Sequence, residues 1–316
     1  MDTARTVLVT GGAGFIGSHV CEGYRDAGWR VVAVDDLSSG RRENVPEGVE
    51  LVEMDIRSDA LPGLMKERRV ELVNHHAAQI DVRVSVARPR HDASINVDGW
   101  LNVLQGALEA GAARVVYVSS GGVVYGEPDR IPTPETAPKA PISPYGISKL
   151  AGEHYLFFHR KVHGLEGVAL RYSNVYGPRQ DPHGEAGVVA LFSSRLLRGE
   201  DLKVFGDGEQ TRDYVYVGDV AAANLELSTA PLVEPDSIDD VAYNVGTGAE
   251  TSVRELAATL IEASGVEAGT EFAPARPGEL LRSCLDTSKL RAAGWAPGVG
   301  LAEGLRRTYE HIAENL

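Results

Sequence analysis

The sequence predicts an α/β fold: a doubly wound parallel sheet of the Rossmann type, joined to a smaller mixed α/β domain. Two features of the first half of the chain support this prediction. Short runs rich in Val, Ile and Leu alternate with stretches of helical periodicity, which is typical of strands that helices bury on both faces. A glycine-rich segment directly follows the first apolar run, as happens where the first strand of such a sheet leads into its first helix.

Each predicted strand is a short, largely apolar run. Strands of the first half are expected at 6–10 (TVLVT), 30–35 (RVVAVD), 49–54 (VELVEM), 71–74 and 114–119 (RVVYVS). Amphipathic stretches between them predict helices, including one over about 15–27, after which Gly28 stands where a helix-ending glycine belongs. Repeated strand–helix units of this kind build a parallel sheet with helices on both sides.

The pattern changes after roughly Tyr172, because loops rich in Gly, Pro and Asp interrupt shorter elements. Helices are expected at 188–197, at 253–263 and from about Leu301. We therefore expect residues 1–173 to form the sheet domain, with 214–247 returning to it, and residues 174–316 to form the smaller domain. A ligand cleft is expected between the two.

Composition and charge exclude several classes of protein. The 316 residues carry a formal net charge of −14, whereas a nucleic-acid-binding protein is usually basic. No apolar run approaches the roughly 18 residues of a membrane span, and the N-terminus lacks the apolar core of a signal peptide. Cys21 and Cys284 are far apart and lack metal-ligand spacing, so neither a disulfide framework nor a metal site is expected. We expect a cytoplasmic protein without nucleic-acid or membrane partners.

The glycine-rich segment reads GGAGFIG at residues 11–17. Gly11, Gly14 and Gly17 permit a tight turn, a close approach of the backbone to a pyrophosphate, and tight packing of helix against strand. The helix that opens with Phe15 and Ile16 offers unpaired N–H groups and a partial positive charge to phosphates. Because a plain strand–helix turn also favours glycine, the segment is informative only together with its flanking strand and helix. In this context it predicts a dinucleotide site.

Asp35 ends the second predicted strand, 18 residues beyond Gly17. A carboxylate at this place accepts hydrogen bonds from the adenosine ribose hydroxyls and repels a 2′-phosphate, which favours NAD over NADP. One alternative is a solvated aspartate at a strand end. Arg41 and Arg42 follow a few residues later and could bind a phosphate, which keeps NADP open.

Tyr145 and Lys149 lie four residues apart at the start of a helix expected after Pro144. This spacing places both side chains on one face, one turn apart. A free tyrosine has a pKa of about 10, and a neighbouring ammonium group together with a positively charged nicotinamide would lower it toward that of a usable general base. Such a pair is common on ordinary helices, so its interpretation as catalytic depends on the dinucleotide site that precedes it.

The segment SSGGVVYG at residues 119–126 ends the fifth predicted strand. Catalytic and ligand-binding groups of open α/β sheets gather at the carboxyl ends of the strands. A serine hydroxyl here could donate a hydrogen bond to the reacting oxygen and relay its proton to Tyr145. The alternative is a serine that only satisfies the loop backbone.

Together these segments resemble the extended short-chain dehydrogenases/reductases, and within them the UDP-glucose 4-epimerases, over essentially the whole chain. The shared motifs are TGGAGFIG (10–17), Asp35, Asp55-Ile56, HHAAQ (75–79), Asn96, SSGGVVYG (119–126), YGISK (145–149), RYSNVYGPRQ (171–180), GDGEQTRDYVYVGD (206–219) and RPGE (276–279). The resemblance implies NAD as the cofactor. It also implies epimerisation at C4 of a UDP-hexose through a transient 4-keto sugar.

The resemblance implies roles for further residues. It places along the cofactor groove Asp55 and Ile56 after the third strand, together with Ala77, Ala78, Gln79, Asn96, Ser119 and Tyr172. It places around the nucleotide of the substrate Asn174, Val188, Lys203, Phe205, Arg212, Arg276 and Glu279. Two arginines from distant segments suit a diphosphate, although a single arginine is more often part of a surface salt bridge.

One position departs from the family's pattern. The family's catalytic Ser or Thr usually lies four residues before Tyr125, where this chain has Gly121, so Ser120 is the candidate hydroxyl. Gly122 and Val123 stand where the related dehydratases and decarboxylases carry acidic residues, so their chemistry is not expected. Family members that reject N-acetylated sugars carry a bulky aromatic residue near the position of Ser283, so UDP-N-acetylhexosamines remain candidate substrates.

Two alternative functions stay open. A UDP-glucuronate 4-epimerase would use the same Tyr145 and Lys149, with Arg83 or Arg179 facing the C6 carboxylate. A non-catalytic NAD-sensing scaffold on the same fold belongs to a different class of protein. The resemblance also implies a homodimer, formed by the helix around 93–108 and the helix that carries Tyr145.

Overall fold

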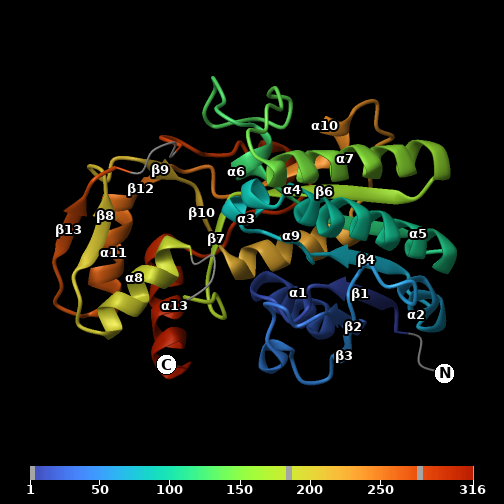
Figure 1. The fold of residues 1–316 in the computed structure, drawn as a ribbon, viewed down its shortest axis with the longest axis horizontal. Helices are drawn as coiled ribbons and strands as arrows, with labels where there is room; N and C mark the ends of the chain where they lie inside the picture. Colours follow the sequence, from blue (N-terminus) through green and yellow to red (C-terminus); the bar gives the residue numbers. More distant parts are fainter. Residues whose placement is uncertain (1–3, 183–186, 276–279, 316) are drawn as a thin grey trace.

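The computed structural model describes residues 4–182, 187–275 and 280–315. The centre of this part of the chain is a seven-stranded sheet with the strand order β11-β6-β5-β4-β1-β2-β3 (Figure 1). All neighbouring strands of this sheet run parallel. The strands are β1 (Thr6–Thr10), β2 (Arg30–Asp35), β3 (Glu50–Glu53), β4 (Leu72–His75), β5 (Arg114–Ser120), β6 (Glu166–Tyr172) and β11 (Ala242–Val245). The predicted doubly wound α/β fold is confirmed.

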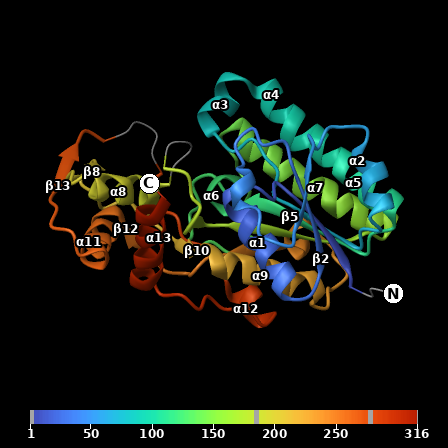
Figure 2. The same cartoon turned by 90° about the horizontal axis from the view of Figure 1, so that it is seen from below.

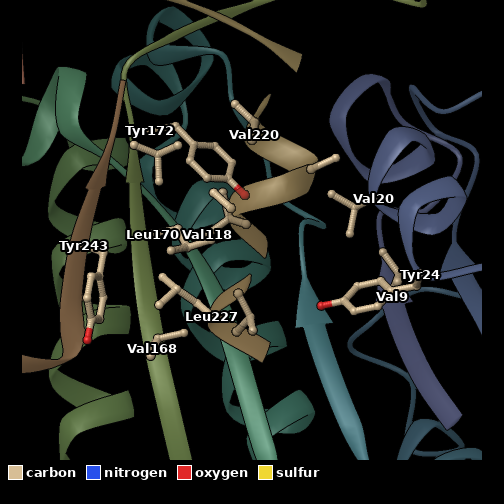
Figure 3. Close-up of a cluster of buried hydrophobic side chains, with 14 of the residues drawn as sticks. Val9, Val20, Tyr24, Val118, Val168, Leu170, Tyr172, Val220, Leu227 and Tyr243 are labelled. Atoms are coloured by element: carbon tan, nitrogen blue, oxygen red, sulfur yellow. The ribbon is translucent and has the colours of Figure 1, made fainter. Parts of the chain in front are cut away.

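Helices cover both faces of the sheet (Figure 2). On one face lie α1 (Phe15–Asp26) and α9 (Val217–Thr229), and on the other α2 (Leu61–Glu67), α5 (Trp100–Ala110) and α7 (Pro144–His163). Neighbouring residues of one strand enter opposite layers, since Val7 and Val9 belong to the cluster beneath α1 and α9 while Leu8 belongs to the cluster beneath α5. Figure 3 shows part of the first cluster. Burial on both faces explains why the strands are almost continuously apolar.

Within the described ranges, the smaller part of the molecule is built from short paired strands and helices. Its strand pairs are β7 (Asn174–Tyr176) with β10 (Tyr214–Tyr216), β8 (Leu202–Phe205) with β13 (Thr270–Ala273), and β9 (Thr211–Arg212) with β12 (Thr251–Ser252). Its helices are α8 (Val188–Leu197), α11 (Val253–Ser264) and α13 (Leu301–Asn315). A separate apolar cluster that includes Phe192, Val204 and Leu256 holds these elements together.

The chain crosses between the two parts more than once. β6 ends at Tyr172 and β7 begins at Asn174, so the first crossing takes a single residue. Residues 214–247 then supply β10, α9, the short α10 (Ile238–Val241) and the edge strand β11. Helix α9 packs against α1, which brings this later segment back onto the sheet.

Short helical segments complete the described part of the chain. They are η1 (Arg42–Asn44), α3 (Val82–Ala87), α4 (Pro89–Ala93), η2 (Ser94–Gly99), α6 (Gly121–Val124) and α12 (Ser288–Ala292). The predicted bounds of the third and fourth strands differ from β3 and β4 by one residue at each end, because strand ends depend on pairing as well as on pattern. In the described ranges, no helix is long and apolar enough to cross a membrane.

The strand order indicates where a ligand would bind at the sheet. From β1 the chain builds outward to β2 and β3 on one side and to β4, β5 and β6 on the other. Ligands of open α/β sheets bind beyond the carboxyl ends of the strands at such a change of direction. The segments that follow β1, β4, β5 and β6 are therefore brought to one place.

Candidate active site

The glycine turn after β1 leaves no room for side chains. Gly11 has a φ of 67°, and a Cβ added to it would lie 2.7 Å from the Ala77 backbone nitrogen. A Cβ on Gly17 would lie 2.1 Å from the Gly11 carbonyl oxygen. Gly14 precedes α1 and gives it no side-chain cap, so the positive end of the helix at Phe15 and Ile16 is available to an anionic group. This cradle fits a pyrophosphate.

Asp35 is buried at the end of β2 and faces the same turn. Its Oδ2 accepts a hydrogen bond from Ala13 N at 3.0 Å and its Oδ1 accepts one from Leu37 N at 2.9 Å. Burial raises the pKa of the carboxyl group, and the two amides oppose that shift. Arg41 lies 3.4 Å from the carboxylate of Asp181, and Arg42 lies 2.7 Å from that of Glu53. Both arginines that could have favoured a 2′-phosphate therefore already have acidic partners.

Asp55 and Ile56 follow β3 next to the end of β2. The Asp55 carboxylate accepts a hydrogen bond from Arg57 N at 2.8 Å and pairs with the Arg57 guanidinium, which lowers its pKa. Ile56 is buried, and its carbonyl oxygen accepts a hydrogen bond from Asn102 Nδ2 at 2.7 Å. The two residues form a rigid corner at this end of the groove.

Hydrogen bonds from Thr10 and from Asn96 fix the segment 77–79 that follows β4. Ala77 N donates to Thr10 Oγ1 at 3.2 Å, and Ala78 follows it. Gln79 N donates to Asn96 Oδ1 at 2.9 Å, while Asn96 Nδ2 donates to the Gln79 carbonyl oxygen at 2.9 Å. The side-chain amide of Asn96 therefore bonds both backbone groups of Gln79 and fixes the path of this segment beside the glycine turn.

Helix α7 brings Tyr145 and Lys149 to the end of β5. The helix begins after Ser143, whose hydroxyl oxygen accepts a hydrogen bond from Gly146 N at 3.1 Å. Lys149 Nζ donates to the Val118 carbonyl oxygen at 2.9 Å and lies 5.8 Å from the centre of the Tyr145 ring. Burial lowers the pKa of Lys149 to about 8, and it raises the pKa of Tyr145 above its ordinary value.

The two serines at the end of β5 have different surroundings. The buried Ser119 hydroxyl donates to Glu153 Oε1 at 2.5 Å, so it is bound to a carboxylate inside the sheet–helix layer. Ser120 is half-buried and, as the next residue of the strand, faces the opposite side. A Cβ on Gly121 would lie 2.6 Å from Leu285 Cδ1. A hydroxyl-bearing side chain at position 121 would require Leu285 to move. Ser120 therefore stays the candidate hydroxyl, although its position in the strand turns it away from Glu153 of α7.

Tyr172 ends β6 but sends its side chain into the core. Its phenol oxygen accepts a hydrogen bond from Asn224 Nδ2 of α9 at 2.7 Å, and burial raises its pKa. Figure 3 shows the ring among Val118, Leu170 and Val220. The backbone of Tyr172 therefore lies at the carboxyl end of the sheet beside Ser120, whereas its phenol contacts Asn224 of α9 and not Tyr145.

A pocket of about 560 Å³ opens in the smaller part of the molecule. It brings together five of the predicted nucleotide-binding residues from separate segments: Asn174, Val188, Lys203, Phe205 and Arg212. Arg276 and Glu279 lie outside the described residues. The pocket begins close to β5 and β6, because Ser120 pairs in register with Tyr172 and Asn174 follows two residues later.

Sequence reasoning missed several residues of the pocket and of the site. Arg195 of α8 and Arg198, which directly follows this helix, line the pocket, and their three-residue spacing could have indicated them. Asp92, Glu153 and Arg171 are buried charges behind the site. Their sequence neighbours give no signal, because their partners come from other elements.

The fold and the site define an enzyme of the extended short-chain dehydrogenase/reductase class, with a glycine turn after β1, a Tyr–Lys pair on α7 and a separate pocket in the smaller part. The chain belongs to the NAD dependent epimerase/dehydratase family, whose model matches residues 7–246, and it is therefore an NAD-dependent enzyme.

Three similar proteins cover nearly the whole chain. The UDP-glucose 4-epimerase of Mycolicibacterium smegmatis is 47% identical over 96% of this chain and 97% of its own length. The structure of the UDP-glucose 4-epimerase of Thermotoga maritima with UDP-glucose has a TM-score of 0.93 at 43% identity, and covers 98% of this chain and 99% of that one. The structure of the UDP-glucose 4-epimerase of Thermus thermophilus with NAD has a TM-score of 0.90 at 45% identity, and covers 99% of this chain and 100% of that one.

Proposed function

We propose that the chain inverts C4 of a UDP-hexose, interconverting UDP-glucose and UDP-galactose through a transient 4-keto sugar. One structural observation supports this proposal above the others. The helix that carries Tyr145 and Lys149 packs at the end of β5, where Lys149 bonds to Val118. Ser120 of β5 pairs with Tyr172 of β6, and Asn174, two residues after Tyr172, lines the cationic pocket. The activity named for the similar proteins supports the same reaction.

The residues of the groove fit NAD. Gly11 and Gly17 leave the cradle that a pyrophosphate needs, Asp35 would accept hydrogen bonds from the adenosine ribose, and Asp55 and Ile56 would border the adenine. Ala77, Ala78 and Gln79, held by Asn96, would form the wall toward the nicotinamide, with the backbone near Ser119 and Tyr172. When bound, NAD would supply the acceptor for the C4 hydride and then its donor to the opposite face of the sugar.

Tyr145 is the proposed general acid/base. Burial by itself raises the pKa of its phenol, so positive charge is needed to make it a base near neutral pH. Lys149 supplies one such charge at one helical turn, and an oxidised nicotinamide adds another. Tyr145 then removes the proton from the 4-hydroxyl, directly or through Ser120, and later returns it to the inverted C4 oxygen.

The smaller part would hold the UDP group while the 4-keto sugar rotates to present its other face. Lys203 and Arg212 line the pocket. Arg195 and Arg198 line it as well, and both of them pair with Glu200. The pocket lining is therefore cationic although the chain is acidic overall. Arg212 would bind the diphosphate, and Asn174, Val188, Lys203 and Phe205 would surround the nucleoside. Tethering the sugar through its diphosphate allows both faces to reach Tyr145 without release.

The substrate range is proposed to include N-acetylated sugars. Ser283 is buried and has a small side chain, and Leu285 of the same segment packs against Val124 and Tyr125 beside the site. Ser283 N donates to the Thr211 carbonyl oxygen at 3.2 Å, next to Arg212 of the pocket. This position lies between the proposed diphosphate site and the catalytic loop, where the hexose would sit.

The division of the chain and its assembly are also proposals. Residues 1–173 with 214–247 would form the NAD-binding domain, and the rest of 174–316 the nucleotide-sugar domain, since β11 and α9 pack on the sheet. Within that segment, β10 instead pairs with β7 of the smaller part. Ile147, Tyr155, Phe158 and Val162 form an exposed apolar stripe along α7, which supports a homodimer through this helix. Cys21 and Cys284 are unpaired thiols, which supports a cytoplasmic location.

Incubation with UDP-galactose or UDP-glucose plus NAD, followed by chromatography of the products, tests the function. We expect both sugars to reach the same equilibrium mixture, and the Tyr145→Phe variant to lose at least about a hundredfold in rate. Turnover of UDP-glucuronate alone would favour the uronate epimerase. Arg83 lies 3.3 Å from Asp81, and Arg179 lies 2.8 Å from Glu22 of α1, so both candidate partners of a C6 carboxylate have other contacts. No turnover of any UDP-sugar would favour an NAD-sensing scaffold.

A further inference from the structure

A buried carboxylate that the proposed reaction does not use lies between the cofactor groove and the catalytic helix. Asp92 of α4 is fully buried. Its Oδ1 accepts hydrogen bonds from Gln79 Nε2 at 3.1 Å and from Asn96 Nδ2 at 3.0 Å. Its Oδ2 accepts a hydrogen bond from Ser148 Oγ at 2.6 Å. One carboxylate thus joins the segment after β4, the η2 turn and helix α7.

These hydrogen bonds continue into the two parts of the site that must stay aligned. On the groove side, Asn96 bonds both the N–H and the carbonyl oxygen of Gln79, so the Asp92–Asn96 pair sets the position of that backbone. On the helix side, Ser148 directly precedes Lys149 and follows Tyr145 by three residues. A shift of Ser148 would therefore carry both proposed catalytic side chains with it.

We propose that Asp92 is a positioning residue, in which one oxygen holds the cofactor-groove segment and the other holds helix α7. The carboxylate then sets the separation between the cofactor and Tyr145. This inference rests on the proposed function, because it assigns Asp92 a part in that reaction. Asp92 itself is not placed in contact with the substrate.

The charge of Asp92 also acts on the groups that face it. It raises the pKa of Tyr145 further, and it opposes the lowering of the pKa of Lys149 by burial. Removing the charge should therefore lower the pKa of both groups. Other titratable groups packed around the same space are Tyr117 of β5, His75 at the end of β4 and His76, which follows β4. Glu153 of α7 also acts on Tyr117.

The variant Asp92→Asn separates the charge from the contacts. An asparagine oxygen can accept from Gln79 and Asn96 while its amide group donates to Ser148, so the three ties can persist. Because the pKa of Tyr145 should fall, we expect the acidic limb of the pH profile of kcat/KM to move to lower pH by about half a pH unit or more. The phenolate absorbance of NAD-loaded protein, measured against Tyr145→Phe, should shift in the same direction. The matched control is Asp98→Asn, which removes an exposed carboxylate six residues along the chain. It should shift neither the acidic limb nor the phenolate absorbance.

The variant Ser148→Ala removes the tie to α7 and keeps the charge. We expect kcat to fall about tenfold with an unmoved acidic limb and unchanged affinity for NAD. The positioning role is overturned if Ser148→Ala, folded as judged by circular dichroism, keeps full kcat. The effect of the charge is overturned if Asp92→Asn leaves both the acidic limb and the phenolate titration in place. A wild-type protein that turns over no UDP-sugar would refute the proposed function. The phenolate titration would still decide whether the charge of Asp92 reaches Tyr145.

Discussion

Glu153 and Arg171 form a wholly buried ion pair, with Glu153 Oε2 and Arg171 Nη2 2.6 Å apart. The pair lies directly behind the end of β5, where Ser119 donates to Glu153 Oε1 at 2.5 Å. Arg171 also donates to the Tyr125 hydroxyl at 2.8 Å and to the Glu135 carbonyl oxygen at 3.0 Å. Since nearly every polar atom of the pair has a partner, both charges can remain in a dry interior.

Removing one member of this pair should cost much stability. Arg171→Met leaves the Glu153 carboxylate buried without its cation, and we expect the free energy of unfolding to fall by about 3 kcal/mol or more. Denaturant unfolding followed by circular dichroism measures the change. The control is Lys161→Met, whose partner Glu234 is exposed, and it should change stability far less. A loss of less than about 1 kcal/mol in Arg171→Met would show that the pair contributes little.

Lys149 should destabilise the cofactor-free protein at neutral pH. Its folded-state pKa is lowered to about 8 from 10.5, so the folded protein binds this proton less tightly than the unfolded chain does. The cost is fully present below pH 8 and disappears as the pH rises from about 8 to about 10.5. Lys149→Met removes the cost but also the hydrogen bond to Val118, so we expect a net gain of about 1–2 kcal/mol at pH 7.

Unfolding curves of wild type and Lys149→Met across this pH range test the sign. The advantage of the variant should shrink as the pH rises toward 10.5, the ordinary pKa of lysine. The variant should also lose activity, because Tyr145 would lack its cationic neighbour. A variant less stable than wild type at pH 7 would mean that the ammonium group is stabilised in the folded state after all.

Gly17 should be essential for binding NAD. In Gly17→Ala the new Cβ would lie 2.1 Å from the Gly11 carbonyl oxygen, so the turn must open and the phosphate cradle is deformed. We expect the dissociation constant for NAD, measured calorimetrically, to rise at least about tenfold. Gly63→Ala is the matched control, because its Cβ meets nothing within 4 Å on helix α2. Equal affinity in both variants would rule out the turn as the phosphate site.

Ser283 should control the size of the sugar that the site accepts. Ser283→Tyr fills the space beside Leu285, and we expect activity on UDP-N-acetylglucosamine to fall about a hundredfold relative to activity on UDP-glucose. Product chromatography with the two substrates gives the ratio. Ser283→Ala should leave the ratio unchanged. If the tyrosine variant slows both substrates equally, position 283 does not face the substituent at C2.

Local patterns predicted much of the fold and part of the site. Helix α8 has the predicted bounds, since an apolar face at helical spacing needs no information from elsewhere. The need for glycine at position 17 was equally readable, because a Cβ there would meet the Gly11 carbonyl oxygen within the same turn, whereas the crowding at Gly11 comes from Ala77 of another segment. Asp92 was missed because its partner Ser148 is 56 residues away, and the proximity of the two depends on the packing of α4 against α7.

By itself the sequence determined five strands of the sheet, several helices, the need for glycine in the first turn and the one-turn spacing of Tyr145 and Lys149, because periodicity and backbone sterics act between near neighbours. Only the tertiary structure decided which of two adjacent serines is bound to Glu153, and that the phenol of Tyr172 lies in the core beneath α9. The reason is that side chains alternate across a strand, while strand order and helix packing decide what each face meets.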